Sequence, residues 1–486
     1  MILAGAVQGK STNAATIRIR ILFMEIKQTQ IPLYQQVPSL DYAQIFTASS
    51  IMFDTGKGQD IATFDVTVRE MPGKRNFLLL GGIEEMVNIL LRWSYEKEFL
   101  DYLVSEKIIS KSFGIYLKNF KFKGDVYCMT EGTVFFPGEP VIRVTTSLCD
   151  ANLLTAFLVN VITYPTLLLS KAARVRLAVN GKHFYFASAM RAFGFENVLK
   201  IQRIAYILGS PIVVPYASYH FKVGKRKPSV GFYHALIKSF PSEQEAYRHF
   251  LPWTEGFGVS TSMVDTYDIK KGIKNWIIVE KEARKNGKSL GAVSIDSGDV
   301  FETSKFLRKE LDKEGLQDTF IVAYSNLDEF KIAELEKKGA KIDVYCAFTE
   351  TITSSDRPVL EVVYKLAETI DKNGIVRHAA KLTPGKTSLP GRKQVFRKYK
   401  KNGEMEFDSI GIEDEHLGKP LLSQYIKNGK LINKLPSLDE IKDYIDEQLL
   451  TLPKNLREIG SVSVYPVKLS SRIGTILNEL KEDKLK

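Results

Sequence analysis

The sequence predicts an α/β protein in which a barrel-like parallel domain accompanies an α+β region. The chain has 486 residues, 44% hydrophobic and 26% charged, enough for roughly two or three domains with large cores. Residues 61–145 combine strand-like alternation with helical periodicity. Residues 200–365 repeat a unit of short apolar strand, polar cluster and helix, which is typical of parallel α/β folds.

The α+β region comes first along the chain. Residues 61–71 (IATFDVTVREM) and 132–146 (GTVFFPGEPVIRVTT) alternate as strands do. Residues 81–93 and 97–106, which lie between them, have helical periodicity. Residues 1–24 read as an N-terminal extension, with Met24 as a candidate start.

An uncharged stretch at residues 151–170 approaches the length of a membrane span. It contains Asn152, Asn160 and Pro165, which favour a helix in a protein core over a helix in lipid. We therefore expect a buried core helix and no membrane segment.

Net charge and cysteine content restrict the partners and the compartment. The charge of +12 favours anionic partners without choosing among nucleic acid, lipid and phosphorylated metabolites. The basic clusters 222–227 (KVGKRK) and 391–401 (GRKQVFRKYKK) lack the aromatic residues of a nucleic-acid platform, so each is interpreted as a solvated face. The three cysteines are far apart and lack zinc-site spacing, which indicates a reducing, cytoplasmic setting.

Five short apolar segments are predicted to be barrel strands. They are 210–217 (SPIVVPYA), 259–268 (VSTSMVDTYD), 291–299 (GAVSIDSGD), 320–326 (FIVAYSN) and 341–350 (KIDVYCAFTE). Residues 302–315 and 327–340 have helical patterns. Because the ends of parallel barrel strands converge, the polar residues after these strands should form one rim.

Acids and hydroxyls dominate this predicted rim. They are Asp265, Thr266, Tyr267 and Asp268, then Asp296, Ser297 and Asp299, then Ser325 and Asn326, then Thr349, Thr351 and Thr353. Such a set suits a phosphorylated sugar with a bound cation, because Mg²⁺ prefers oxygen ligands. Helix capping explains Ser297, Asp299 and Asn326 equally well. Asp328 and Glu329 fit the first turn of the next helix and need no functional role.

Seven ordered motifs resemble the nicotinate phosphoribosyltransferase family, which has the type II phosphoribosyltransferase fold. The motifs lie at 62–85, 131–144, 166–178, 264–268, 295–299, 363–366 and 389–398. The resemblance implies an irregular parallel α/β barrel beside a second α/β domain, an α+β sandwich built from N- and C-terminal segments, and a homodimer with shared active sites. The expected ranges are an extension (1–30), an N-terminal domain (31–150), a barrel (151–370) and a C-terminal segment that packs back on the N-terminal domain (371–486).

The resemblance also implies the chemistry. The family joins nicotinate to phosphoribosyl pyrophosphate, which gives nicotinate mononucleotide for NAD synthesis. ATP hydrolysis is coupled through a phosphorylated histidine, and Mg²⁺ is required. His234, in a stretch that should begin a helix, matches that histidine, and Asp296 matches the acid near ribose and metal. The remaining candidate substrate-binding residues are Arg191, Ser297, Asp299, Asn326 and Thr349.

Several active-site motifs depart from the family pattern. The family's DFGxRRAxG stands here as FASAMRAFG at 186–194, its TSN as residues 213–215 (VVP), and its FGVGT as residues 345–349 (YCAFT). The last change removes glycines whose backbone N–H groups would approach a phosphate.

These departures leave two hypotheses. The first is an active enzyme with a remodelled pocket, in which Lys225, Arg226 or Lys227 replaces lost cations. The second is a paralogue that has lost the reaction and binds, regulates or serves as a partner subunit, or that acts on another base.

Overall fold

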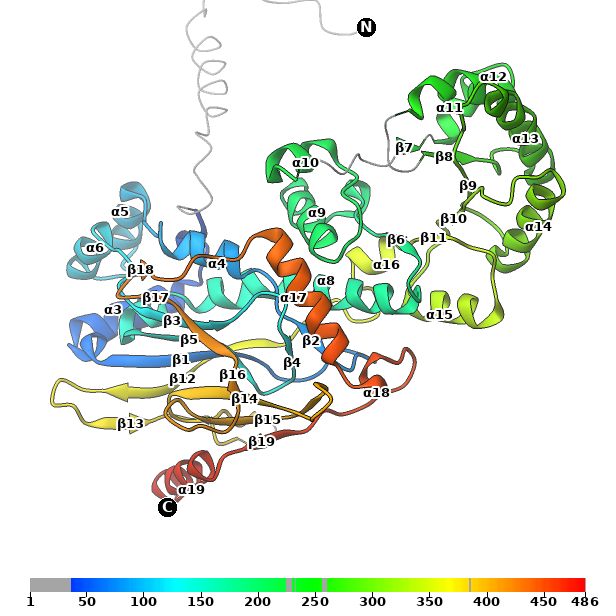
Figure 1. Cartoon of the computed structure of the whole chain (residues 1–486). Helices are drawn as coiled ribbons and strands as arrows, with labels where there is room; N and C mark the ends of the chain where they lie inside the picture. The colour runs from blue at the N-terminus through cyan, green and yellow to red at the C-terminus, as the bar shows by residue number, and fades with distance from the viewer. Residues whose placement is uncertain (1–35, 224–229, 232, 256–259, 384–385, 486) are drawn as a thin grey trace, which may run out of the picture.

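The computed structural model describes residues 36–223, 230–231, 233–255, 260–383 and 386–485. The expected extension at residues 1–30 and the basic residues Lys225, Arg226 and Lys227 lie outside these ranges. Figure 1 shows two regions, one with mainly antiparallel sheets, called the antiparallel region below, and one in which helices cover a parallel sheet.

A seven-stranded antiparallel sheet organises the first region. Its strand order is β13-β12-β1-β5-β3-β17-β18. The bounds are β1 Ile61–Val68, β3 Asp125–Met129, β5 Pro140–Ser147, β12 Val362–Ile370, β13 Val376–His378, β17 Leu422–Lys427 and β18 Lys430–Leu431. Strands from both ends of the chain pair here, which confirms the expected domain of N- and C-terminal segments. The range 151–370 expected for the barrel thus includes one strand, β12, that pairs with β1 in this sheet.

Two smaller sheets complete this region. One has the order β16-β14-β15-β19 and the other pairs β2 with β4. The bounds are β2 Leu78–Leu79, β4 Val134–Phe135, β14 Lys393–Tyr399, β15 Met405–Ile412, β16 Lys419–Pro420 and β19 Val467–Leu469. The solvated face predicted for residues 391–401 is wrong for the first half of that cluster. Lys393 and Arg397 are buried. Each has an acidic partner that offsets the cost of burying its charge: Asp65 lies 2.6 Å from Lys393 Nζ, and Asp408 lies 2.6 Å from Arg397 Nη2.

Helices cover these sheets. They are α3 Ala43–Asp54, α4 Ile83–Leu90, α5 Lys97–Ser105, α6 Lys111–Lys118, α7 Leu148–Asn152, α17 Leu438–Thr451, α18 Lys454–Arg457 and α19 Ser471–Leu485. Short 3₁₀ turns are η1 Val37–Ser39, η2 Lys57–Gln59, η3 Ala189–Arg191, η4 Phe195–Asn197 and η5 Leu251–Trp253. The two helices predicted before residue 110 are confirmed as α4 and α5.

Helix α8 (Thr155–Ala178) lies between the two regions and contacts both, through β2 and β12 on one side and α15 and α16 on the other (Figure 1). By length and composition it could cross a membrane, but 72% of its most apolar stretch is buried inside the protein. The predicted core helix is therefore confirmed.

A six-stranded, all-parallel sheet forms the second region, in the order β6-β11-β10-β9-β8-β7. The strands are β6 His183–Tyr185, β7 Val230–Gly231, β8 Ser260–Met263, β9 Ala292–Ile295, β10 Ile321–Ala323 and β11 Val344–Cys346. The helices are α9 Val198–Ile207, α10 Pro215–Phe221, α11 His234–Lys238, α12 Glu243–Phe250, α13 Ile269–Lys285, α14 Val300–Lys313, α15 Glu329–Lys338 and α16 Thr349–Ile352. This sheet confirms the parallel α/β class. Within the described residues it is open, since β6 and β7 are its two edges.

Four of the five predicted barrel strands are confirmed, as β8 to β11. The prediction of a strand at 210–217 is wrong. The backbone N–H groups of Val213 and Val214 donate to Gln202 Oε1 at 2.9 and 3.2 Å, and α10 begins at Pro215. The apolar run packs against α9 instead of joining a sheet. Its apolar composition is that of a short strand, and this is why the sequence pattern predicted one.

Candidate active site

A histidine and two carboxylates meet at the ends of the parallel strands. His234 is the first residue of α11, as expected. Its Nδ1 lies 3.0 Å from Thr266 Oγ1, and its Nε2 lies 3.9 Å from Asp296 Oδ2. The side chains of His234 and Asp296 are 33% and 47% exposed. The imidazole and the carboxylate therefore face one another at a site that is open to substrate.

Asp265 holds the strand end that carries Asp296. Its Oδ2 accepts hydrogen bonds from the Asp296 N–H and the Ser297 hydroxyl, both at 3.0 Å. Its Oδ1 is buried without a hydrogen-bond partner among the described residues. Burial and the negative charge of Asp265 raise the pKa of Asp296, while His234 acts in the opposite direction. Asp265 is thus part of the site, although the sequence reasoning did not single it out from the other rim acids.

The two carboxylates fit the Mg²⁺ that the family resemblance implies. Among the described residues no group of three or more His, Cys, Asp and Glu side chains could hold a metal. Mg²⁺, however, is usually bound by one or two carboxylates together with water and substrate phosphates. The unpaired Oδ1 of Asp265 and the carboxylate of Asp296 provide that donor set. When bound there, the cation would neutralise charge on a pyrophosphate leaving group.

The other predicted site residues divide into three groups. Arg191 donates from Nε to Thr349 Oγ1 at 3.1 Å, and both belong to segments beside the parallel sheet. Asp299 caps α14, because its Oδ1 accepts from the N–H groups of residues 301 and 302 at 2.9 and 3.1 Å. Asn326 is exposed with a φ of 41°, and its carbonyl accepts from Lys331 Nζ at 2.9 Å. The structure therefore places Asp296 between His234 and Asp265, joins Ser297 to Asp265, and gives Asp299 a capping role.

The segment that replaces the family's glycine-containing phosphate loop is packed rather than open. Tyr345, Cys346 and Ala347 are buried, and Phe348 packs against Tyr324 with ring centroids 5.8 Å apart. Helix α16 then begins at Thr349. The segment therefore carries packed side chains at the positions where the family pattern has glycines.

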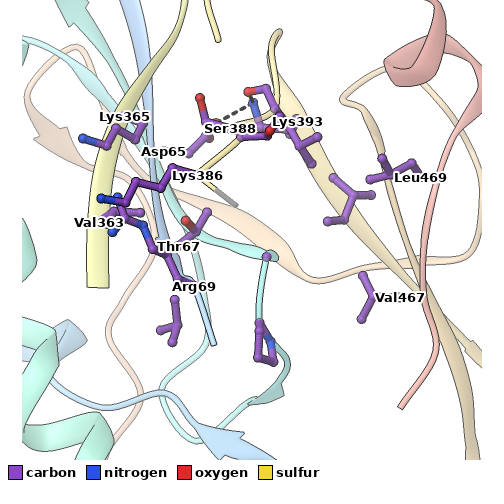
Figure 2. Close-up of a pocket in the computed structure, with 16 residues that line it drawn as sticks. Asp65, Thr67, Arg69, Val363, Lys365, Lys386, Ser388, Lys393, Val467 and Leu469 are labelled. Atoms are coloured by element: carbon purple, nitrogen blue, oxygen red, sulfur yellow. Dashed lines mark hydrogen bonds and ion pairs between the residues drawn. The ribbon is translucent and has the colours of Figure 1, made fainter. Parts of the chain in front are cut away.

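A separate basic pocket of about 350 Å³ lies between β1, β12 and the segment before β14 (Figure 2). That size is sufficient for a small ligand. Arg69, Lys365 and Lys386 line it, with Val467 and Leu469 on the opposite side. Four of the motifs that carry the family resemblance, at 62–85, 131–144, 363–366 and 389–398, contribute lining residues. This pocket was not predicted from the sequence. The presence of four family motifs outside the predicted rim was the signal that could have indicated a second site.

Electrostatics favour an anion in this basic pocket. Arg69 has one distant acidic partner, Glu361, at 3.8 Å, and among the described residues Lys365 and Lys386 form no ion pair. Burial and the nearby positive charges of Arg69 and Lys381 lower the pKa of Lys365. A bound phosphate would relieve that repulsion and gain charge-assisted hydrogen bonds.

A parallel α/β sheet with paired carboxylates and a histidine at its strand ends, together with a basic pocket, is the arrangement of an enzyme of the α/β class that suits an anionic substrate. Residues 41–163 match the nicotinate phosphoribosyltransferase (NAPRTase) N-terminal domain, and residues 419–477 match the nicotinate phosphoribosyltransferase C-terminal domain. The chain is 32% identical over 457 residues to nicotinate phosphoribosyltransferase pncB2 of Mycobacterium tuberculosis, covering 93% of this chain and 94% of that protein. The chain belongs to the nicotinate phosphoribosyltransferase family.

Other relatives agree. The nicotinate phosphoribosyltransferase of Bacillus subtilis is 30% identical over 461 residues, which is 88% of this chain and 92% of that protein. Human nicotinic acid phosphoribosyltransferase has a similar structure, with a TM-score of 0.77 and 22% identity over 91% of this chain and all of that chain. Nicotinate-nucleotide pyrophosphorylase from Pyrococcus furiosus follows with a TM-score of 0.67 and 21% identity, covering 87% and 98%. These two structures support the fold.

Proposed function

We propose that the protein catalyses transfer of the phosphoribosyl group from phosphoribosyl pyrophosphate to nicotinate, which yields nicotinate mononucleotide for NAD synthesis. The observation that carries this proposal is the convergence of His234, Asp265 and Asp296 at the strand ends in a member of this family. The alternative of an inactive paralogue would not require these three groups to stay together. The free, buried cysteines fit a cytoplasmic enzyme.

The two carboxylates support this reaction electrostatically. Departure of pyrophosphate leaves positive charge on the ribose, and a nearby carboxylate stabilises that charge and can accept hydrogen bonds from ribose hydroxyls. Asp296 is the exposed member of the pair and faces the substrate, while Asp265 orients it through the backbone N–H of Asp296. Holding the nicotinate nitrogen close to the anomeric carbon then supplies much of the rate.

His234 is the proposed site of phosphorylation by ATP. Its Nδ1 is engaged with the Thr266 hydroxyl, which leaves Nε2 as the nucleophile, 3.9 Å from Asp296. In this proposal the Nε2 lone pair attacks the γ-phosphorus of ATP and ADP leaves. Water later cleaves the phosphohistidine and releases phosphate.

The basic pocket is proposed to bind phosphate groups of the substrates. We infer a homodimer in which the basic pocket of one subunit lies next to the rim of the other subunit. The pocket belongs to the antiparallel region, whereas the carboxylates belong to the parallel region of the same chain (Figure 1). Large apolar side chains near Arg191 are exposed, with Met190 at 70%, Phe193 at 64% and Phe195 at 89%. Exposed patches of this kind are typical of subunit interfaces.

The experiment is a product assay with the full-length protein. Nicotinate, phosphoribosyl pyrophosphate and Mg²⁺ are supplied with and without ATP, and nicotinate mononucleotide is separated by chromatography. We expect product, a faster rate with ATP, and an acid-labile phosphate that is absent in His234→Asn. Nicotinamide supplied in place of nicotinate tests which base the protein accepts.

One observation favours the second candidate, a paralogue that binds but does not react. The packed, glycine-free segment at 345–349 removes a phosphate cradle. If the assay gives no nicotinate mononucleotide and no phosphohistidine while phosphoribosyl pyrophosphate still binds, the paralogue is the correct reading.

A further inference from the structure

Five charged side chains from four segments of the chain form a buried ion cluster, namely Arg75, Lys171, Arg174, Glu329 and Asp356. Lys171 Nζ lies 2.6 Å from Glu329 Oε2 and 2.8 Å from Asp356 Oδ1, so it bridges the two carboxylates. Arg174 Nε is 3.2 Å from Glu329 Oε1, and Arg75 Nη2 is 3.2 Å from Asp356 Oδ1. Asp356 is 22% exposed and the other four side chains are at most 1% exposed. Glu329 lies in the first turn of α15, as expected, but its burial in ion pairs with Lys171 and Arg174 was not expected from the sequence.

The cluster is a poor source of net stability. It contains three cations and only two carboxylates, so one positive charge is not balanced within the cluster. The ring of Phe330 is the aromatic neighbour of two of the cations, at 5.8 Å from Lys171 Nζ and 5.6 Å from Arg174 Cζ. The cost of removing such charges from water usually offsets most of their mutual attraction. We therefore expect the cluster to fix the relative positions of the segments that it joins, and not to add much to the free energy of unfolding.

Two of those segments belong to the rim. Glu329 begins α15 directly after the turn that contains Asn326. Asp356 follows α16, which begins at Thr349. Arg75 Nη2 also donates to the hydroxyl of Ser354, whose φ of 47° lies in the left-handed region that residues other than glycine rarely adopt. The cluster thus holds a strained backbone next to the rim.

A third segment belongs to the basic pocket. Arg75 lies in the loop that leaves β1 after Arg69, one of the pocket cations. Next to Asp356, Arg357 Nη2 lies 2.9 Å from a carboxylate oxygen of Glu70, the neighbour of Arg69. The cluster, through Arg75, and the adjacent Arg357–Glu70 pair therefore both connect the rim segments with the loop of the basic pocket.

We propose that the ion cluster is a positioning device that fixes the Asn326 turn and the Thr349 segment at the rim, and the Arg69 loop at the basic pocket, in the positions that bind phosphoribosyl pyrophosphate. This inference rests on the function proposed above. Lys171 is its central positioning residue, because it alone contacts both carboxylates.

The test variant is Lys171→Met. It removes the bridge but leaves two balanced pairs, Glu329 with Arg174 and Asp356 with Arg75, so the variant is expected to fold. Because small displacements of substrate-binding groups cost large factors in rate, we expect the KM for phosphoribosyl pyrophosphate to rise about tenfold. The KM for nicotinate should stay within about twofold, since the effect is on phosphate-binding segments.

The matched control is Lys182→Met. It breaks an ion pair with Glu336 near the opposite end of the same helix α15, at 2.7 Å, and does not touch the cluster. Amide hydrogen exchange, which needs no activity, is measured in both variants. Exchange at residues 324–330 and 349–356 should accelerate about tenfold in Lys171→Met and should match wild type in Lys182→Met.

Equal exchange rates and equal KM values in the two variants would overturn the proposal. If wild type makes no nicotinate mononucleotide, the proposed function fails, while the exchange data still decide whether the cluster holds the rim. If Lys171→Met does not fold, Ser354→Gly replaces it. That change removes the hydroxyl that Arg75 binds and releases the strained backbone, so unchanged exchange at residues 349–356 would equally contradict the proposal.

Discussion

Burial decides the charge of individual residues in the antiparallel region. Glu139 is fully buried beside Asp408, whose carboxylate is paired with Arg397 at 2.6 Å. Burial, and then the negative charge of Asp408, raise the pKa of Glu139 well above its usual value of 4.5. The protonated form is therefore the one that the folded state favours.

This raised pKa predicts a pH-dependent stability. Below about pH 4.5 Glu139 is protonated in both the folded and unfolded states, and its contribution is fully present. As the pH rises through the raised pKa that contribution is lost, whereas a glutamine does not titrate. The free energy of unfolding of Glu139→Gln relative to wild type should thus increase by about 1.4 kcal/mol per pH unit from pH 4.5 up to the raised pKa of Glu139, and then level off.

Urea denaturation of both proteins between pH 5 and pH 8 measures this difference. Titrating groups that do not interact with Glu139 cancel because they are shared by the two proteins. A difference that stays constant over this range would show that Glu139 is ionised in the folded protein.

Sequence reasoning at the residue scale located the rim but did not assign all roles within it. Asp296 and His234 could be predicted because each stands at a recognisable motif. Asp265 and Glu329 could not be distinguished from neighbouring acids, since their roles depend on residues far along the chain. Glu329 is buried by Lys171 and Arg174 of α8, and no local pattern reports such a contact.

At the scale of elements, the close approach of the Gly81–Gly82 turn to α8 shows how a proline is used inside a helix. Pro165 lacks an N–H, so the carbonyl of Val161 has no partner one turn later. Gly82 lies against that carbonyl with a φ of +92°, and a Cβ there would stand 2.5 Å from the Val161 oxygen. Both the backbone angle and the contact require glycine.

Gly82→Ala should therefore lower the free energy of unfolding by more than the cost of placing an alanine at a left-handed backbone angle. The matched control is Gly181→Ala, at a φ of +86° with open space around the added carbon. We expect the control to cost about 1–2 kcal/mol from its left-handed backbone, and Gly82→Ala to exceed the control by at least about 2 kcal/mol. Equal losses in the free energy of unfolding would show that the turn can move away from α8.

Elements were predictable where periodicity and length agreed. The parallel strands β8 to β11 and the helices α14 and α15 each had a clear pattern. The strands β6 and β7 have only three and two residues and gave no signal. The wrong strand at 210–217 arose because a loop that is bonded to a buried glutamine is as apolar as a strand.

At the scale of the whole molecule, the proposed homodimer predicts complementation between damaged subunits. Asp296→Asn damages the rim and Lys365→Ala damages the basic pocket. If the pocket of one subunit serves the rim of its partner, a mixed dimer retains one intact site. After co-expression, an equimolar mixture should recover about a quarter of wild-type activity, because half of the dimers are mixed and one of their two sites is whole.

The control is a mixture of Asp296→Asn with His234→Asn, in which both changes fall on the rim, so no site in a mixed dimer is intact. Recovery in the first mixture and none in the second would support shared sites. No recovery in either would place the rim and the pocket of one site on the same chain.

The most direct test of the central claim is the rate of nicotinate mononucleotide formation by Asp296→Asn. The substitution preserves shape, and because Asp296 is 47% exposed beside another carboxylate, the fold should keep its melting temperature. Loss of the negative charge that faces the ribose should lower kcat by about 10³-fold relative to wild type. A folded Asp296→Asn variant that retains more than about a tenth of the wild-type rate would contradict the assignment of this rim as the active site.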